Sequence, residues 1–200
     1  MLARRSVPFD SDRHLFELKW DGIRALAFVG HEGYRLVSRW GHEITAQFPE
    51  LACLSGLPHG TLLDGELIAL KDAQPHLGSL QSRLHVGDPI KVTHRARAAP
   101  VTYVVFDLLY DCFTSVMSES LTVRRDRLAA VVKQYDYPRL VFSEGIVGSG
   151  IALFEEVGRL GLEGVVAKEL ASGYRPGRRG GAWLKIKCGR CAANRPRPEC

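Results

Sequence analysis

The chain has 200 residues, of which 46% are hydrophobic, and its formal net charge is +5 at pH 7. This length and composition are those of a globular protein with one substantial core, so we expect one catalytic domain. No stretch approaches the roughly 20 apolar residues that a membrane span needs, and the N-terminus lacks the apolar region of a secretory signal. We therefore expect a cytoplasmic protein. The positive charge favours a polyanionic partner only weakly, because many basic proteins bind no nucleic acid.

Basic side chains are concentrated near the C-terminal end. Residues 170–198 contain no Asp or Glu. Lys185 and Lys187 alternate with apolar residues, which predicts a half-buried strand whose two lysines share one face and can converge on one anion. Residues 188–200 are rich in Pro and Arg, and we expect them to form a basic, disordered tail. The basic residues of the whole segment are Arg175, Arg178, Arg179, Lys185, Lys187, Arg190, Arg195 and Arg197.

The five cysteines do not suggest a disulfide framework, because their number is odd and the chain has no secretory signal. We expect free thiols. Cys188 and Cys191 have the spacing of half a zinc knuckle. A structural zinc site needs four ligands, however, and no second Cys or His pair lies nearby, so we assign no metal to this pair.

Alternating and aliphatic-rich patterns predict several strands. Residues 15–19 read as a strand that leads into a loop at Lys19, and residues 62–70 and 102–109 read as further strands. Residues 25–29 and 34–38 flank a glycine-containing turn and predict a hairpin.

Helical periodicity is visible in two places, residues 123–135 and residues 151–160. Residues 85–99 are rich in His and Arg and poor in pattern, which predicts a surface loop. Strands interleaved with helices, without regular βαβ spacing, predict an α+β fold with mainly antiparallel sheets flanked by helices.

The most informative stretch is Lys19-Trp20-Asp21-Gly22-Ile23-Arg24. A lysine amine is a poor nucleophile at its ordinary pKa of about 10.4, so a lysine that attacks a phosphate near neutral pH needs a pKa lowered by burial or by neighbouring cations. The alternative is a plain hairpin turn, since Asp-Gly readily supplies the positive φ of a tight turn. Motifs elsewhere in the chain favour the nucleophile.

Further stretches match, in order, the motifs of one family. They are SRWG (38–41), LDGEL (63–67), VVFDLL (104–109), EGVVAK (163–168) and WLKIK (183–187). With the stretch at Lys19, they resemble the adenylation domain of ATP-dependent DNA ligases, within the covalent nucleotidyltransferase superfamily that also holds RNA ligases and mRNA capping enzymes. The run SGYRPGRR (172–179) resembles the segment that joins the last two motifs in bacterial end-joining ligases. The resemblance implies the DNA ligase and capping enzyme nucleotidyltransferase fold, which is ATP-grasp-like, with a nucleotide cleft between two sheets.

The resemblance also implies a reaction. The Lys19 amine would attack the α-phosphate of ATP, release pyrophosphate and form lysyl-AMP, with most of the catalysis coming from positioning and electrostatic stabilisation. Lys185 and Lys187 match residues that contact the α-phosphate, and their charge would also lower the pKa of Lys19. AMP would then pass to the 5′-phosphate of a nicked DNA strand, and the 3′-hydroxyl would displace AMP and seal the nick.

Other matched positions would bind the nucleotide. Arg24 and Arg39 match arginines beside the ribose and phosphates, where a planar guanidinium can bind two oxygens. Phe106 matches the aromatic residue that stacks on adenine, and Glu17 matches a residue at the adenine edge. A packed core is the alternative role for Phe106, because aromatic residues also dominate ordinary cores. The remaining nucleotide-binding assignments are Asp21, Gly22 and Lys168. For Lys168, the alternative is a solvated position at the end of a strand.

Two carboxylates match the metal site of the family. Glu66 matches an acidic residue that bonds the ribose or helps to hold metal, and Glu163 matches a glutamate that faces the divalent ion. Mg²⁺ or Mn²⁺ suits such a site, because magnesium favours carboxylate and phosphate oxygens and usually keeps several waters. The alternative for both residues is an exposed strand charge.

The chain departs from the family after Lys187. The family continues into an OB-fold domain with a sixth motif of the type Arg-x-Asp-x-Lys, whereas here only residues 188–200 follow. We therefore expect an adenylation domain over residues 1–187, no OB-fold domain, and poor nick sealing by the chain alone. An excised domain, a truncated product and one half of a split enzyme all remain open.

The expected partners follow from the same resemblance. They are nicked or broken double-stranded DNA, and an OB-fold domain or end-joining proteins supplied in trans, with the chain itself a monomer. Phosphate contacts by Lys and Arg would give affinity without sequence preference. Two alternatives stay open, an RNA ligase or capping enzyme that uses the same chemistry, and an inactive remnant that binds nucleotide or DNA.

Overall fold

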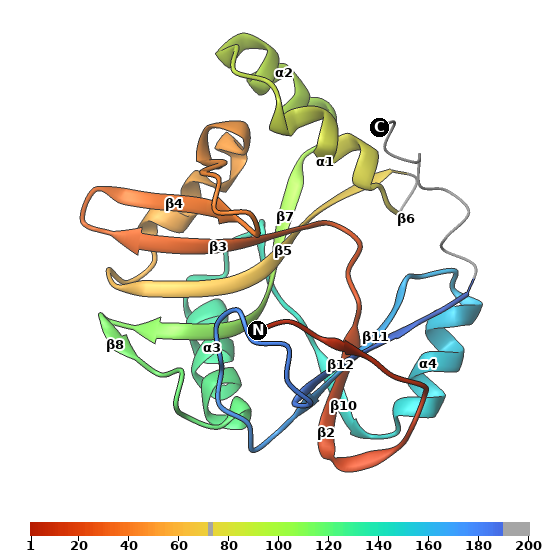
Figure 1. Ribbon diagram of the computed structural model, residues 1–200. Coiled ribbons are helices and arrows are strands. Elements are labelled where there is room, and N and C mark those ends of the chain that lie inside the picture. The colour runs from red at the N-terminus through yellow and green to blue at the C-terminus, as the bar shows by residue number, and fades with distance from the viewer. Residues whose placement is uncertain (72–73, 190–200) are drawn as a thin grey trace. The chain divides into compact units, whose positions relative to one another are not determined.

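The computed structural model describes residues 1–71 and 74–189 (Figure 1). The chain forms two compact units, a first unit of Met1–Lys19 with Glu144–Cys200 and a second unit of Trp20–Ser143. The predicted tail lies outside the described residues from position 190 onward, and so do Cys191 and Cys200. Within the described residues, no helix is long and apolar enough to cross a membrane.

The first unit is a sheet with a helix on one face. The strand order is β1-β12-β11-β2-β10, with β1 parallel to β12 and the other neighbours antiparallel. Helix α4 packs against β11 and β2, and Figure 1 shows it beside β11. The bounds are β1 (Arg4–Arg5), β2 (Ser11–Leu18), β10 (Gly145–Gly148), α4 (Gly150–Arg159), β11 (Gly164–Glu169) and β12 (Trp183–Lys187).

The core of the first unit lies between this sheet and α4. Phe16, Val165, Ala167 and Ile186 are fully buried strand residues that pack with Val157 of α4. Because successive side chains of a strand point to opposite faces, the residues between them belong to the other face of the sheet. That face carries Glu17, Lys168, Lys185 and Lys187 and is called the polar face, although Val166 and Trp183 also belong to it.

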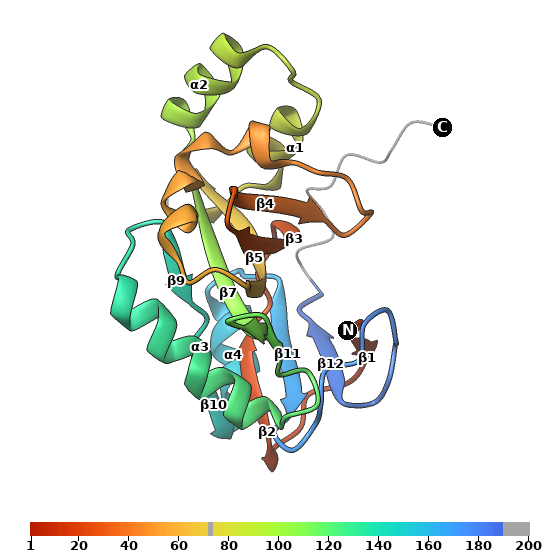
Figure 2. The ribbon, with the colours of Figure 1, turned by 90° about the vertical axis from the view of Figure 1, so that its left-hand side faces the viewer.

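The second unit is a larger sheet with helices. Its main strand order is β4-β3-β5-β7-β8, all antiparallel, while β6 pairs with β5 and β9 runs parallel to β7. Helix α3 packs along β7 (Figure 2). The strands are β3 (Ile23–Gly30), β4 (Gly33–Ser38), β5 (Thr61–Lys71), β6 (Gln74–Pro75), β7 (Val101–Asp111), β8 (Thr114–Ser115) and β9 (Leu140–Phe142). The helices are α1 (Leu77–Leu84), α2 (Pro89–Ala98), α3 (Leu121–Tyr135) and the 3₁₀ helices η1 (Thr45–Gln47) and η2 (Pro49–Gly56).

The predicted α+β fold with mainly antiparallel sheets and flanking helices is confirmed, as are the predicted strands, hairpin and two helices. The surface loop predicted for residues 85–99 was wrong, because helix α2 lies there. The Asp88 carboxylate caps it by accepting two backbone hydrogen bonds from the first turn, and Pro89 fits the first turn without losing a bond. Val92 and Ala96, one turn apart, form its buried face.

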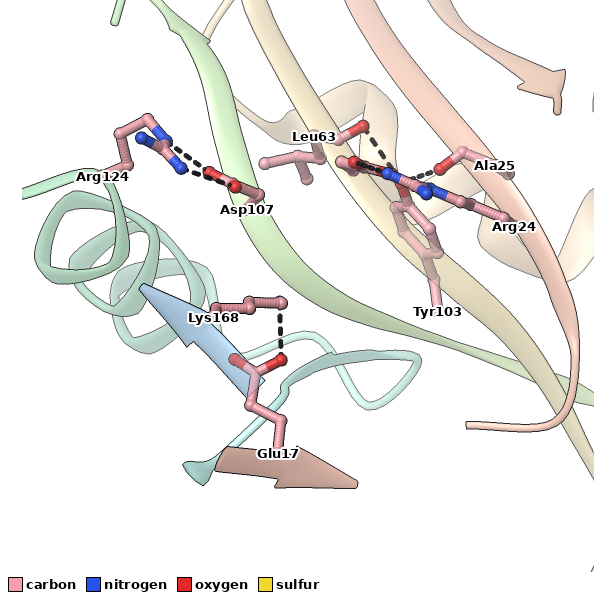
Figure 3. Close-up of polar contacts among 9 residues, drawn as sticks. Glu17, Arg24, Ala25, Leu63, Tyr103, Asp107, Arg124 and Lys168 are labelled. Carbon is pink, nitrogen blue, oxygen red and sulfur yellow. Dashed lines mark hydrogen bonds and ion pairs between the residues drawn. The ribbon is translucent and has the colours of Figure 1, made fainter. Parts of the chain in front are cut away.

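A glycine of the LDGEL motif makes room for a buried tyrosine. The Tyr103 hydroxyl donates between the carbonyl oxygens of Ala25, at 2.8 Å, and Leu63, at 3.2 Å, and so joins β7 to β3 and β5 (Figure 3). A Cβ at Gly65 would lie 2.6 Å from the Tyr103 ring and 2.6 Å from the Val104 carbonyl oxygen. Such distances are too short for a contact with a carbon atom, so the observed position of the Tyr103 ring requires glycine at residue 65.

We therefore expect Gly65→Ala to lower the free energy of unfolding by about 1–3 kcal/mol, because the added methyl group must displace the ring or the β7 backbone. Urea unfolding followed by circular dichroism measures the change. Gly30→Ala is the matched control, since nothing lies within 4 Å of a Cβ at Gly30. Its effect should stay within about 0.5 kcal/mol. Equal stability of the two variants would contradict the role given to Gly65.

Candidate active site

The polar face of the first unit's sheet gathers the predicted catalytic lysines. The Lys19 backbone N–H donates to the Gly164 carbonyl oxygen at 2.8 Å, and Gly164 is paired with Lys187 on the other side of β11. Glu17 and Lys185 likewise face each other across Val166 of β11. Because side chains alternate along each strand, all four side chains lie on the face opposite α4.

Glu163 joins two of these lysines. Its Oε2 accepts a hydrogen bond from Lys19 Nζ at 2.6 Å, and its Oε1 accepts one from Lys187 Nζ at 2.8 Å. The Glu163 side chain is only 4% exposed, against 22% for Lys19 and 36% for Lys187. Burial by itself would raise the pKa of Glu163, but the hydrogen bonds and charges of Lys187 and Lys19 outweigh burial and lower that pKa. The carboxylate is therefore charged at neutral pH and holds the Lys19 ammonium in place.

A second ion pair on this face is fully buried. Lys168 Nζ lies 2.6 Å from Glu17 Oε2, and both side chains are 2% exposed (Figure 3). The Lys168 ammonium also lies over the Trp183 ring, 4.6 Å from its centre. The alternative of a solvated strand end is thus wrong for Lys168. Each charge needs the other, because an isolated buried charge is very costly. Nucleotide binding by Glu17 or Lys168 stays a prediction.

In the second unit, a cavity of about 720 Å³ brings together four of the residues predicted to bind nucleotide. They are Gly22, Arg24, Arg39 and Glu66. Arg39 is exposed and stacks on the Trp40 ring, 5.3 Å from its centre. Apolar side chains of α1 complete the lining, so the cavity offers both a cationic and an apolar wall.

Arg24 is oriented by a carboxylate that the sequence reasoning missed. Its Nε and NH2 donate to the two Asp64 oxygens at 2.9 and 2.6 Å, and Asp64 is fully buried. Asp64 precedes Glu66 by two residues, so both side chains belong to the face of β5 that lies opposite the core. That spacing within LDGEL was the available signal for Asp64.

Phe106 occupies a β-bulge. Residues 64 and 65 of β5 pair with Asp107 and Val105, which leaves Phe106 as an extra residue on β7. A bulge re-aims a side chain, and here it leaves the ring half-buried, 5.5 Å from the Arg24 guanidinium carbon. The alternative of a fully packed core residue does not describe it. Stacking on adenine stays a prediction.

The loop after Lys19 has no space for a side chain at Gly22. A Cβ there would lie 2.1 Å from the Leu67 carbonyl oxygen, so the loop approaches β5 as only glycine allows. Asp21, beside it, is half-buried. Gly22 therefore has a packing role in addition to its place in the cavity lining.

A buried ion pair that the sequence reasoning did not assign supports the strand that carries Phe106. Asp107 accepts hydrogen bonds from Arg124 Nε at 2.7 Å and NH2 at 2.9 Å, and both side chains are completely inaccessible (Figure 3). The pair joins α3, which carries Arg124, to β7, which carries Asp107. Loss of either partner would leave an uncompensated buried charge.

The residues predicted to bind a metal ion are two separate carboxylates, Glu66 and Glu163. Among residues 1–71 and 74–189, no three His, Cys, Asp or Glu side chains come together as a metal site. Glu163 and Glu66 belong to different units. Magnesium is commonly bound by one or two carboxylates together with substrate phosphates and water. These residues therefore fit an ion that arrives with a nucleotide, rather than one held by protein alone.

A second cavity, of about 590 Å³, lies in the first unit and is lined by three arginines. Arg175, Arg178 and Arg179 are exposed, and Glu169 is the acidic residue in the same lining. Their loop is anchored by Tyr174, which is buried edge-on against the Trp183 ring at 5.9 Å. The loop thus presents a fixed cluster of positive charge.

Known proteins resemble nearly the whole chain. A family model described as "ATP dependent DNA ligase domain" matches residues 1–187. The SPbeta prophage-derived DNA ligase-like protein LigB of Bacillus subtilis is 33% identical over 90% of this chain. The multifunctional non-homologous end joining protein LigD of Pseudomonas aeruginosa is 35% identical over 86% of it. The solved structure of a mycobacterial DNA ligase D complexed with ATP and MES covers 94% of this chain, with 30% identity and a TM-score of 0.77.

These matches confirm the resemblance drawn from the motifs and the nucleotidyltransferase fold that it implied. The chain spans only part of its relatives, 63% of LigB, 20% of LigD and 59% of the solved chain.

The Glu163 interactions predict a pH dependence of stability. A carboxylate with a lowered pKa stabilises the folded state above its ordinary pKa of about 4.3, and this stabilisation is lost as the pH falls below that value. We expect Glu163→Gln to lower the free energy of unfolding at pH 7 by about 1–3 kcal/mol, with a smaller difference from wild type near pH 3. Urea unfolding at both pH values measures it. Glu156→Gln, which removes an exposed pair with Arg159, is the control. A Glu163→Gln effect independent of pH would contradict the assignment.

Proposed function

This chain belongs to the ATP-dependent DNA ligase domain family, and we propose that it performs the adenylation step of that family with Lys19 as the nucleophile. The observation that carries the proposal is the polar sheet face on which Glu163 holds Lys19 Nζ at 2.6 Å beside Lys187 and Lys185. A nucleophile directly after a strand of the sheet, with cations on β12 of the same sheet, suits in-line attack on a phosphate.

The proposed step forms a bond between Lys19 Nζ and the α-phosphorus of ATP and breaks the bond from that phosphorus to the oxygen that bridges to the β-phosphate. Pyrophosphate leaves with the bonding electron pair. Lys19 Nζ must lose one proton first, and Glu163 Oε2, which accepts a hydrogen bond from it at 2.6 Å, would take that proton. Lys187 and Lys185 would stabilise the charge that develops on the α-phosphate oxygens.

The second unit would recognise the nucleoside. The Phe106 ring would stack on adenine, and Glu66 in the cavity lining would accept a hydrogen bond from the ribose. Arg24, held in direction by Asp64, and Arg39 would bind ribose or phosphate oxygens. Mg²⁺ or Mn²⁺ bound with ATP would neutralise phosphate charge, and Glu163 in the first unit and Glu66 in the second unit are the carboxylates that we propose as ligands for such an ion.

DNA is the proposed acceptor of AMP. The arginine-lined cavity of the first unit supports this, because it presents three exposed guanidinium groups that suit the phosphates of a polyanion, although Glu169 also lies in its lining. Transfer of AMP to a 5′-phosphate and sealing of a nick are part of the proposal, as is the help of an OB-fold domain or end-joining proteins. Because the matching family model is described as an ATP dependent DNA ligase domain and LigB is named a DNA ligase-like protein, the proposal favours DNA over the RNA ligase and capping alternatives. We also propose that the chain is monomeric and acts in the bacterial cytoplasm.

Covalent labelling tests the adenylation step. Incubation with α-³²P-ATP and Mg²⁺, followed by denaturing electrophoresis, should leave label on the wild-type chain. Lys19→Ala should carry no label, and Lys19→Arg should carry none either, because a guanidinium keeps the charge but is not a nucleophile. Lys133→Ala, on the exposed surface of α3, is the control and should label normally. An unlabelled wild type, or label that survives in Lys19→Ala, would contradict the proposal.

Salt dependence tests the DNA contact. We expect the triple variant Arg175→Ala, Arg178→Ala, Arg179→Ala to bind nicked duplex more weakly and to reduce the slope of log K against log salt by about 0.9 for each lost phosphate contact. Fluorescence anisotropy at several salt concentrations measures the slope. A triple variant of Lys91, Arg97 and Lys133 to Ala removes the same charge from exposed sites elsewhere. The same slope in both variants would rule out a specific role for the arginine cavity.

A further inference from the structure

A hydrogen bond joins the two places where the chain passes between its compact units. The passages lie between Lys19 and Trp20 and between Ser143 and Glu144. The Trp20 indole N–H donates to Ser143 Oγ at 3.2 Å, and both residues belong to the second unit. The hydrogen bond thus ties together the first and last residues of the second unit, and the first of them, Trp20, directly follows Lys19.

Ser143 is a firmly held acceptor. Its side chain is completely buried, and its backbone N–H donates to the Val105 carbonyl oxygen at 2.8 Å. Its own carbonyl oxygen accepts a hydrogen bond from Arg125 NH2 at 2.7 Å, and the Arg125 guanidinium lies over the Phe142 ring, 4.4 Å from its centre. Two backbone hydrogen bonds therefore fix Ser143, and the Phe142 ring supports the guanidinium that makes one of them.

The backbone around Lys19 is restrained on both sides. Before it, the Lys19 N–H is bonded to the Gly164 carbonyl oxygen at 2.8 Å. After it, Trp20 is bound to Ser143, and Gly22 packs against the Leu67 carbonyl, where no Cβ fits. The half-buried Trp20 ring is therefore part of the restraint on the residue that precedes it.

We propose that Trp20 and Ser143 are positioning residues for adenylation, because their hydrogen bond restrains the residue that directly follows Lys19 in the chain. The inference rests on the proposed function, in which Lys19 is the nucleophile. It extends that function to an indole and a hydroxyl that do not contact the reacting atoms. Displacement of a reacting group by about 1 Å can cost a factor of about 10² in rate, so even a small loss of restraint is measurable.

A double-mutant cycle tests the coupling. Trp20→Phe keeps an aromatic ring and loses the N–H, and Ser143→Ala loses the acceptor. We expect each to slow single-turnover lysyl-AMP formation at saturating ATP by about tenfold, with the double variant no slower than the slower single variant. ATP affinity should change by less than about twofold, because the ground-state contacts to ATP remain. Tyr34→Phe, which loses an aromatic hydroxyl bonded to the Phe48 carbonyl oxygen at 3.4 Å, is the matched control and should keep the wild-type rate.

Hydrogen exchange provides a readout that does not depend on ATP. We expect the Lys19 amide, followed by NMR, to exchange about tenfold faster in Trp20→Phe and Ser143→Ala than in wild type or Tyr34→Phe, because the restraint after Lys19 is lost. Unchanged exchange at Lys19 would overturn the proposal, and so would unchanged rates or fully multiplicative losses in the double variant. If wild type forms no lysyl-AMP, the proposed function fails, whereas the exchange data still decide whether Trp20 and Ser143 restrain Lys19.

Discussion

One buried carboxylate, Glu163, organises the polar face of the first unit. It accepts a hydrogen bond from Lys19 with one oxygen and from Lys187 with the other. Without it, two ammonium groups on one sheet face would repel each other in an environment partly shielded from water. The antiparallel register of β2, β11 and β12 brings the three residues together, and the apolar packing of the opposite face on α4 maintains that register. The candidate chemistry therefore depends on the same alternation that builds the core.

In the second unit, buried carboxylates likewise orient basic side chains, which here are arginines. Asp64 orients Arg24 toward the cavity, and Asp107 holds Arg124 against the strand that carries Phe106. Bidentate pairs of this kind fix direction as well as distance. Buried ion pairs contribute little net stability compared with apolar packing, so their value here lies in the geometry that they impose. Tyr103 also holds these strands together. Its ring packs against Gly65, and its hydroxyl is hydrogen-bonded to the Ala25 carbonyl oxygen.

Much of this architecture was predictable from the sequence, and what was missed has physical causes. The order of the motifs predicted Lys19, Glu163 and Lys187 as site residues, and the structure brings these three together, with the two C-terminal lysines on one face as strand alternation predicted. The contact of Asp64 with Arg24 was not predictable, because it depends on the register between strands far apart in sequence. The bulge at Phe106 is likewise set by the pairing of β5 with β7. Helix α2 was missed because a high content of His and Arg concealed the spacing of Val92 and Ala96, and α1 was not predicted at all.

The central claim is that the polar sheet face presents Lys19, rather than a neighbouring lysine, to the α-phosphate of ATP. Tandem mass spectrometry of the protein after incubation with ATP and Mg²⁺ tests this claim most directly, because it locates an adenylyl group on a single residue. We expect a phosphoramidate-linked AMP on Lys19 alone. An adenylyl group on Lys185 or Lys187, or a wild-type chain that remains unmodified, would contradict it.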